Sequence, residues 1–305
     1  MVWRSSRCRQ SGVRSGRLAG RYGVPDVSII LPCYNAEAFL NEAVESARAQ
    51  TYSSKEIIVI DDGSTEPETA AALAALPDDV RVVHQENRGL PSARNRGFEE
   101  ATGRYVLPLD CDDWIEPTYV TDAVALIDGR EDAFVFPWID AFGQFEAKLE
   151  KHWNLAEQLV ANQMPYCMLI PRVLWTRVGG YDETMRLGYE DWEFNIRLGL
   201  SGAEGLCLAQ HVFHYRVAAT GMLQAVAHQR HGQLWRAIQE RHTDDYRPGR
   251  FIGHLRAWSD RPKAHATWKL LAFYAAHRLL PDAAFARLFR RVLQGSHLRR
   301  EAARG

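Results

Sequence analysis

Short runs of β-branched apolar residues alternate with segments of helical spacing from residue 27 to about residue 136. The runs predict strands, and the segments between them predict helices. This alternation is typical of a parallel sheet whose strands are joined by crossover helices. The predicted strands are 27–31, 56–60, 80–83, 104–109 and 133–136, and the predicted helices are about 36–50, 66–75, 90–102 and 117–129.

The periodicity fades after Pro137, where an aromatic stretch predicts loops and short helices. Order returns with a predicted strand at 166–170, a helix that begins near Glu190 and ends before Gly202, and a strand at 206–217.

The chain from about residue 222 predicts helices, and its segment 268–293 interleaves apolar residues with arginine at helical spacing. An apolar helix face of this kind can cover the protein's own core or lie on a membrane surface. Covering the core is the favoured interpretation.

Composition narrows the class of protein. The 305 residues are 46% hydrophobic and 25% charged, which suits one large core or one domain with an appendage. A net charge of -1 argues against a general nucleic-acid binder. The five cysteines are scattered without a C-x-x-C pair, and no stretch approaches the length of a membrane span. We therefore expect a reducing compartment and a cytoplasmic location, with no nucleic-acid partner.

Polar clusters follow several of the predicted strands. The carboxyl ends of parallel strands are where ligands bind in such sheets. LPCYNAE (31–37) and DDGS (61–64) each end a strand, although both also suit ordinary turns that cap the next helix.

The segment Asp110-Cys111-Asp112-Asp113 ends an apolar strand with three carboxylates, which repel one another unless a cation lies among them. Mg²⁺ or Mn²⁺ suits such oxygen ligands and is often shared with substrate phosphates. A solvated acidic turn is the alternative. An EF-hand calcium loop is disfavoured, because Trp114 and Ile115 follow where further oxygen ligands and a glycine are needed.

GYEDWEF (188–194) places Glu190 and Asp191 at the start of a predicted helix, where acids also complement the helix dipole for structural reasons. His211 and His214 lie in a predicted strand and suit half-buried structural imidazoles equally well. A G-x-G-x-x-G or P-loop motif follows none of the predicted strands, which disfavours dehydrogenases and P-loop NTPases.

Taken in order, the segments VSIILPCYN, EIIVIDDGS, NRGLPSARNRG, GRYVLPLDCDDWIEP, VGGYDETMRLGYEDWEF and HYRV resemble glycosyltransferase family 2. The resemblance covers about residues 26–220. It implies an α/β GT-A fold, the fold of nucleotide-diphospho-sugar transferases, with a mostly parallel sheet flanked by helices. A C-terminal helical extension would follow this domain.

The resemblance implies a role for each matching residue. Asp191 matches the catalytic base, with Glu190 and Trp192 on the substrate side. Asp112 would bind the divalent metal, with His214 as a further metal or diphosphate contact. The expected nucleotide-sugar contacts are Pro32, Tyr34, Glu37, Asp62, Arg94, Asp110, Cys111 and Arg216.

The expected reaction is an inverting, metal-dependent transfer from a nucleotide-diphosphate sugar to an acceptor hydroxyl, in the synthesis of cell-surface polysaccharide or glycoconjugate. The acceptor would be a saccharide or a lipid-linked molecule, and the C-terminal helices could contact a membrane peripherally. Two alternatives stay open: a pseudoenzyme that binds nucleotide-sugar without transfer, and a metal-dependent nucleotidyltransferase. The expected organisation is a basic, disordered tail (1–25), a catalytic domain (26–221) and a helical extension (222–305).

Two positions depart from the family pattern. The family commonly follows its Tyr-Arg pair with a Gly-Ser turn, whereas this chain continues with Ala218, Ala219, Thr220 and Gly221. Cys111 stands where a small residue such as serine or alanine is usual, so the site is expected to be sensitive to thiol reagents.

Overall fold

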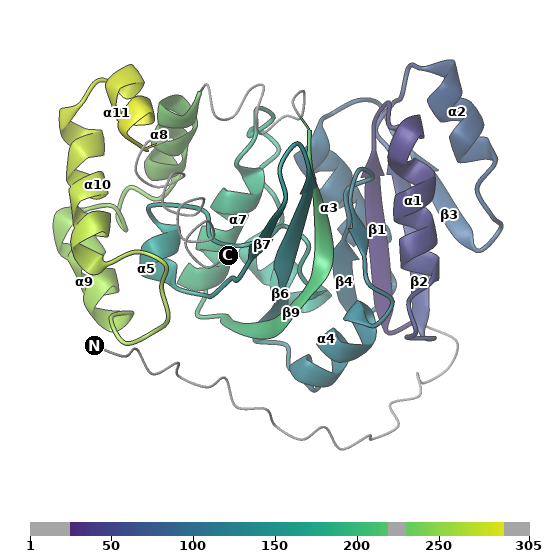
Figure 1. Cartoon of the computed structure of the whole chain (residues 1–305), viewed down its shortest axis with the longest axis horizontal. Coiled ribbons are helices and arrows are strands. Elements are labelled where there is room, and N and C mark those ends of the chain that lie inside the picture. Colours follow the sequence, from purple (N-terminus) through teal and green to yellow (C-terminus); the bar gives the residue numbers. More distant parts are fainter. Residues whose placement is uncertain (1–24, 219–229, 290–305) are drawn as a thin grey trace.

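The computed structural model describes residues 25–218 and 230–289 (Figure 1). The predicted tail before residue 25, the turn at 219–221 and the last residues of the predicted helix 268–293 lie outside these ranges. Two sheets stand side by side at the centre of Figure 1, with the C-terminal helices at one end of the molecule.

The first sheet has the strand order β3-β2-β1-β4-β8. Strands β1 to β4 are parallel, and β8 is antiparallel to β4. These strands are β1 (Val27–Cys33), β2 (Lys55–Asp61), β3 (Val80–His84), β4 (Tyr105–Pro108) and β8 (Ile170–Pro171). The predictions for β1 to β4 are confirmed to within two residues at each end. Only the end of the strand predicted at 166–170 is regular strand, as β8.

Both faces of the sheet are buried along β1, β4 and most of β2, which explains why these strands are mainly apolar. On β1, Ile29 and Leu31 join one core cluster, whereas Ile30 joins the cluster on the opposite face. The predicted helices are confirmed as α1 (Glu37–Arg48), α2 (Pro67–Ala74), α3 (Leu90–Glu100) and α4 (Tyr119–Ile127), and α6 (Arg172–Val178) was not predicted.

The second sheet has the order β5-β9-β6-β7, and it corrects the prediction of loops after Pro137. Its strands are β5 (Trp114–Ile115), β6 (Ala133–Gly143), β7 (Ala147–Leu149) and β9 (Glu204–Val217). Strand β6 runs through Pro137 because the register against β9 shifts there. A proline cannot donate a hydrogen bond to its neighbour strand, and such an irregularity accommodates it.

The remaining helices are α5 (Leu155–Gln158), α7 (Glu190–Leu200), α8 (His231–Arg241), α9 (Pro248–Ala257), α10 (Thr267–Leu279) and α11 (Asp282–Phe289). Residues of α5 and α7 share one core cluster with residues of α8 to α11. Leu270, Phe273 and Tyr274 of α10 are buried in it, which confirms that one face of this helix covers the protein's own core. Within the two described ranges, no helix is long and apolar enough to cross a bilayer.

Candidate functional site

The candidate site lies where the order of the first sheet reverses. Strand β1 is followed in the chain by β2 on one side, and its neighbour on the other side is β4. Loops that leave the carboxyl ends of such strands diverge and open a crevice, which is the usual ligand site of this architecture. The segment Asp110–Asp113 follows β4 directly and therefore lies at this edge.

Arg94 of α3 joins the acidic segment to the start of α7. Its Nη2 atom lies 2.9 and 2.8 Å from the two carboxylate oxygens of Asp110, and its Nη1 atom lies 2.7 Å from Oε1 of Glu190. The side chain is 2% exposed, and its guanidinium carbon lies 4.7 Å from the ring centroid of Tyr166. Arg94 was expected to face the nucleotide, but the structure places it in a buried ion-pair bridge.

Glu190 is buried at the other end of this bridge. Burial raises its pKa to about 7, and the positive charge of Arg94 acts in the opposite direction. Glu190 was expected to contact the substrate. In the structure its carboxylate instead points toward Arg94 inside the protein.

Asp113 fixes the acidic segment to Tyr166 and to strand β9. Its carboxylate accepts hydrogen bonds from the hydroxyl of Tyr166 at 2.6 Å and from the main-chain N–H of Arg216 at 2.6 Å. Tyr166 also accepts a hydrogen bond from the main-chain N–H of Asp110 at 2.9 Å. Tyr166 was not predicted to take part in the site, because its sequence neighbourhood indicates only an apolar strand.

The third carboxylate, Asp112, differs from its neighbours. Asp110 is paired with Arg94, and both carboxylate oxygens of Asp113 accept hydrogen bonds. At Asp112, by contrast, Nε of Arg216 donates to the main-chain carbonyl at 2.8 Å and not to the carboxylate. Burial and the negative charge of Asp110 raise the pKa of Asp112 to about 6. A nearby cation would stabilise this carboxylate in its charged form.

A hard divalent cation fits Asp112 only as a shared ion. Among residues 25–218 and 230–289, no group of three His, Cys, Asp or Glu side chains is arranged to hold a metal. Mg²⁺ commonly takes one or two carboxylates and completes its coordination with substrate phosphates and water. The residues present therefore suit a metal that arrives with a diphosphate better than one caged by protein alone.

His214 of β9 is held by other carboxylates. Its Nε2 atom lies 2.9 Å from Oε1 of Glu116, and its Nδ1 atom lies 3.8 Å from Oδ2 of Asp140. Its ring stacks on Trp114 with the centroids 3.4 Å apart. To serve as the predicted metal contact, His214 would have to leave Glu116.

Arg216, which was expected to lie beside the phosphates of the donor, lies next to the acidic segment. Its guanidinium packs between the rings of Phe39 and Phe142, 4.5 Å from each centroid, and forms an ion pair with Glu42. A phosphate that approached Nη2 of Arg216 would compete with Glu42 for this atom.

The loops after β1 and β2 are tied together. The side-chain oxygen of Asn35 accepts a hydrogen bond from the main-chain N–H of Thr65 at 2.9 Å. Next to it, the ring of Tyr34 is 49% exposed and free to stack on a planar ligand. Glu37, at the start of α1, accepts a hydrogen bond from Thr69 of α2 at 3.2 Å.

Cys111 contributes to packing in this region. It is buried, and its thiol donates to the carbonyl of the buried residue Pro32 at 3.1 Å. This contact joins the acidic segment to the end of β1. Neither side chain is open to a ligand in this structure, although both were expected to border the nucleotide.

Asp62 was expected to contact the base, but its carboxylate orders a neighbouring loop. It accepts hydrogen bonds from Gln85 Nε2 at 2.7 Å and from the main-chain N–H groups of Arg88 and Gly89 at 2.9 and 2.8 Å. Asp62 is also buried, and three donors already occupy its carboxylate. A hydrogen bond to the nucleotide base would have to use a lone pair that these donors leave free.

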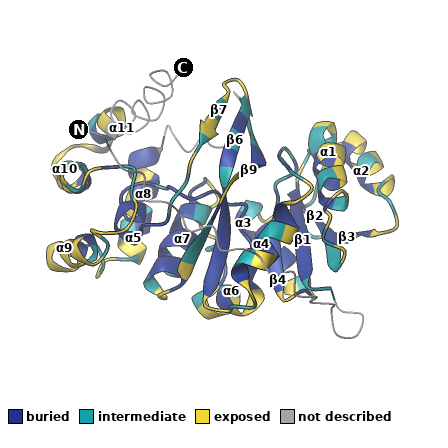
Figure 2. Ribbon diagram, turned by 60° about the horizontal axis from the view of Figure 1, so that its bottom comes forward, coloured by how far each residue is buried: buried dark blue, intermediate teal, exposed yellow. Residues whose placement is uncertain are grey.

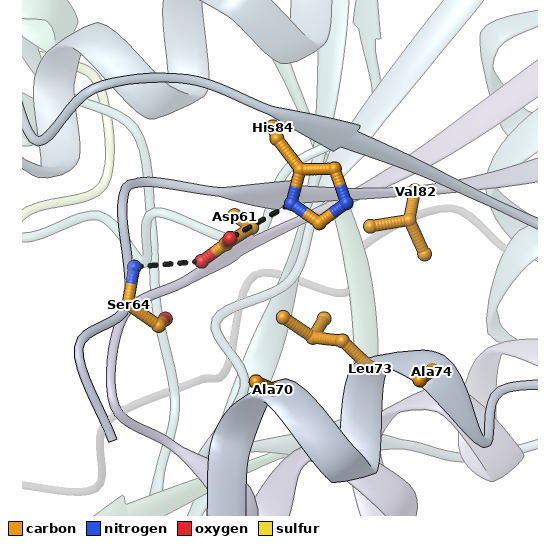
Figure 3. A pocket seen from close by; sticks show the side chains of 7 residues that line it. All are labelled: Asp61, Ser64, Ala70, Leu73, Ala74, Val82 and His84. Carbon is orange, nitrogen blue, oxygen red and sulfur yellow. Dashed lines mark hydrogen bonds and ion pairs between the residues drawn. The ribbon is translucent and has the colours of Figure 1, made fainter. Parts of the chain in front are cut away.

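A cavity of about 330 Å³ lies beside β2, β3 and α2 (Figure 3). Asp61 at its wall accepts hydrogen bonds from the main-chain N–H of Ser64 at 2.9 Å and pairs with Nδ1 of His84 at 2.9 Å. The residues lining this cavity include neither Asp112 nor Asp191. The cavity is therefore adjacent to the DDGS turn and separate from the proposed reacting groups.

Asp191 stands at the amino end of α7 and is partly buried. Its Oδ1 atom accepts the main-chain N–H of Trp192 at 2.7 Å, and its Oδ2 atom accepts a hydrogen bond from Asn162 at 2.9 Å. Burial raises its pKa above the ordinary value for aspartate. Tyr189, two residues before Asp191 at the N-cap of α7, has φ 66°. Non-glycine residues adopt this left-handed conformation at an energetic cost, and such residues cluster at functional sites.

Trp192 packs inside the protein instead of facing a substrate. It is 1% exposed, and its indole N–H donates to the carbonyl of Gln158 at 2.5 Å. Its ring stacks against Trp235 of α8. The C-terminal helices therefore support the first turn of α7, where Asp191 lies.

Comparison with known proteins identifies relatives of this chain. The family model described as "Glycosyl transferase family 2" matches residues 28–193. A putative glycosyltransferase, EpsH of Bacillus subtilis, is 42% identical over 97 residues, which cover 31% of this chain and 28% of EpsH. An uncharacterized glycosyltransferase of Rickettsia bellii is 28% identical over 239 residues, covering 72% of this chain and 34% of that protein. The chain thus spans about a third or less of the length of these two relatives.

Solved structures of S. aureus TarS have a similar fold. TarS 1–349 superposes with a TM-score of 0.60 at 16% identity, covering 88% of this chain and 92% of that one. The same segment in complex with UDP-GlcNAc gives a TM-score of 0.60 at 19% identity, covering 70% and 65%. At this identity the likeness concerns the fold alone.

Proposed function

Because this chain belongs to glycosyl transferase family 2, we propose that it transfers a sugar from a nucleotide-diphosphate donor to an acceptor hydroxyl with inversion at the anomeric carbon. The observation that supports this most directly is the bridge through Arg94. It pairs Asp110 with Glu190, and it thereby links the segment that carries Asp112 to the helix that carries Asp191, the two carboxylates suited to opposite ends of the reaction.

On the donor side, Asp112 would hold a Mg²⁺ or Mn²⁺ ion that the diphosphate brings with it. Such an ion supplies Lewis-acid stabilisation of the charge on the leaving diphosphate. Asp113 and Tyr166 keep the loop in place, and Arg216 lies next to Asp112 with a positive charge. Tyr34 offers an exposed ring to the base of the nucleotide.

On the acceptor side, Asp191 would take the proton from the attacking hydroxyl. The pKa of Asp191 is raised toward the operating pH, and a general base transfers protons more readily when its pKa lies near that pH. Attack from the face opposite the diphosphate inverts the anomeric centre. Glu190 would not share this role, because it is paired with Arg94 inside the protein.

The identity of the donor can be tested directly. One of the TarS structures is a complex with UDP-GlcNAc, and we propose a uridine diphosphate sugar as the first donor to try. Thermal shift of the purified chain should be measured with UDP-, GDP- and dTDP-sugars, each with and without Mn²⁺. Stabilisation by one donor that depends on Mn²⁺ is expected, and stabilisation that is equal with and without metal would contradict the metal-dependent proposal.

Two other functions remain distinguishable. A pseudoenzyme would bind the nucleotide-sugar but release no nucleoside diphosphate, and a nucleotidyltransferase would release pyrophosphate. The proposed reaction releases a nucleoside diphosphate in amounts equal to the glycosylated product. The acceptor, which we propose to be a saccharide or a lipid-linked molecule of cell-surface polysaccharide synthesis, can then be screened by product mass.

We further propose that the outer face of α10 rests on an anionic membrane surface. Trp268, Leu271 and Leu279 lie on one face of the helix and are 67%, 40% and 81% exposed. Figure 2 shows α9 and α10 at one end of the molecule, with exposed residues along them. Between positions 256 and 280 there is a single acid, Asp260, and the basic residues are Arg256, Arg261, Lys263, Lys269 and Arg278.

This composition suits an interfacial helix, in which apolar side chains enter the headgroup region and basic ones attract anionic lipids. A peripheral position of this kind would bring the enzyme to a lipid-linked acceptor.

A further inference from the structure

We infer that Asn162 is a positioning residue for the carboxylate of Asp191, and that a chain of side-chain amides running back to Gln158 fixes its orientation. This inference rests on the proposed role of Asp191 as the base. Asn162 belongs to the segment between α5 and β8, where the sequence shows no recognisable motif. The contact that matters joins Nδ2 of Asn162 to Oδ2 of Asp191 at 2.9 Å.

The orientation of the Asn162 amide follows from its other contacts. Its Oδ1 atom accepts a hydrogen bond from the main-chain N–H of Met164 at 3.3 Å and one from Nε2 of Gln158 at 2.7 Å. An amide oxygen accepts and an amide nitrogen donates, so these two donors settle which end of Asn162 faces them. The nitrogen end must therefore face Asp191.

The orientation of the Gln158 amide, which donates to Asn162, also follows from its contacts. Its Oε1 atom accepts the main-chain N–H of Gln163 at 3.0 Å, which leaves its Nε2 atom to donate to Asn162. Gln158 is fully buried, and its main-chain carbonyl accepts the indole N–H of Trp192. This chain of hydrogen bonds, the amide relay, therefore begins at the main-chain N–H of Gln163, which can only donate, and ends at the carboxylate of Asp191.

The relay has two consequences for Asp191. First, each carboxylate oxygen is held by one donor, Oδ1 by the N–H of Trp192 and Oδ2 by Asn162. Each oxygen keeps a lone-pair direction for a hydroxyl, and the carboxylate plane cannot rotate freely. Second, a hydrogen bond donated to the ionised form lowers the pKa of the carboxyl group. Asn162 thus opposes the effect of burial on the pKa of Asp191.

The test compares Asn162→Ala with the wild type and with Asn41→Ala, which removes an exposed asparagine of α1. We expect Asn162→Ala to lower kcat by roughly 10- to 100-fold while leaving donor binding unchanged, because only the base is affected. The acidic limb of the kcat–pH profile should move to higher pH. Asn41→Ala should match the wild type in both measurements.

A second variant separates positioning from simple packing. Gln158→Met keeps the volume of the side chain and its main-chain carbonyl but removes the donor to Asn162, together with the acceptor of the Gln163 main-chain N–H. It should lower kcat by less than Asn162→Ala does, and it should have no additional effect in the Asn162→Ala background, because the two residues act through one contact. Additive losses, or an unshifted pH profile in a folded Asn162→Ala variant, would overturn the inference.

The failure of this inference is distinguishable from the failure of the proposed function. If Asp191→Asn retains turnover, Asp191 is not the base and the proposed mechanism fails. If Asp191→Asn is inactive while Asn162→Ala has the wild-type kcat and pH profile, the base assignment stands and the positioning role of Asn162 is refuted.

Discussion

Arg94 of α3 donates to Glu190 of α7 over 2.7 Å, although the two residues are 96 positions apart in the chain. The same guanidinium holds Asp110 with two further contacts. One buried cation therefore neutralises two carboxylates from opposite sides of the candidate site. This pairing couples the acidic loop to the helix that carries Asp191, and it is the first feature to test.

Replacing Arg94 should destabilise the protein strongly. Arg94→Met would leave Asp110 and Glu190 without their partner, and breaking a buried ion pair commonly costs about 3–5 kcal/mol. Urea unfolding checks the change in free energy. Arg96→Ala is the control, because its pair with Glu100 is partly exposed and is worth less than about 1 kcal/mol. Equal effects of the two substitutions would contradict the structural role of Arg94.

Asp191→Asn should abolish transfer and retain donor binding. The amide cannot accept the hydroxyl proton, and the loss of a general base commonly costs roughly 100- to 10,000-fold in rate. Calorimetric titration with the donor and a transfer assay measure the two properties on the same sample. Asp78→Asn, at an exposed loop position, should behave as the wild type.

Metal binding at Asp112 should weaken below about pH 6. The pKa of this carboxyl group is raised to about 6, so above that pH it is ionised and below it a proton competes with the metal. Titration of Mn²⁺ in the presence of the nucleoside diphosphate, at pH 5 and pH 7.5, checks this.

We expect weaker Mn²⁺ binding at the lower pH and little binding by Asp112→Asn at either pH. Chelation of the metal should stop transfer in the wild type. Activity that survives complete chelation would refute the metal-dependent mechanism.

Substitutions on the outer face of α10 should release the protein from anionic vesicles. We expect the triple change of Trp268, Leu271 and Leu279 to serine to reduce sedimentation with phosphatidylglycerol vesicles by at least tenfold, while the thermal transition changes little, since these side chains are exposed. Val173→Ser is the control, because Val173 is 48% exposed on α6. If the wild type sediments equally with neutral and anionic vesicles, or with neither, the membrane proposal is wrong.

The extent of sequence-based prediction differs between the two sheets. Strands β1 and β4 are buried along their whole length and β2 over its last five residues, so each contains an apolar run that is recognisable without its neighbours. Strands β6 and β9 pair with each other over 11 positions, and β6 passes through Pro137 at an irregularity that local patterns do not predict. Strand β5 has only two residues, and its existence depends on pairing with β9.

The sequence by itself determined the polar clusters at the strand ends, their order along the chain and therefore the family. Those features depend on local patterns and on motif spacing. It did not determine which of the similar carboxylates is paired. Asp110, Asp112 and Asp113 look equivalent in the sequence, yet the fold pairs Asp110 with Arg94 and ties Asp113 to Tyr166.

The tertiary structure alone decided that Asp62 orders a loop, that His214 pairs with Glu116, and that Asn162 reaches Asp191. These contacts join residues at least 23 positions apart. The charge and hydrogen-bonding capacity of a side chain can be read from its residue type, but its partner depends on how distant elements pack. For that reason the chemistry of this site was predictable as a set of residue types, and the roles of the individual residues required the fold.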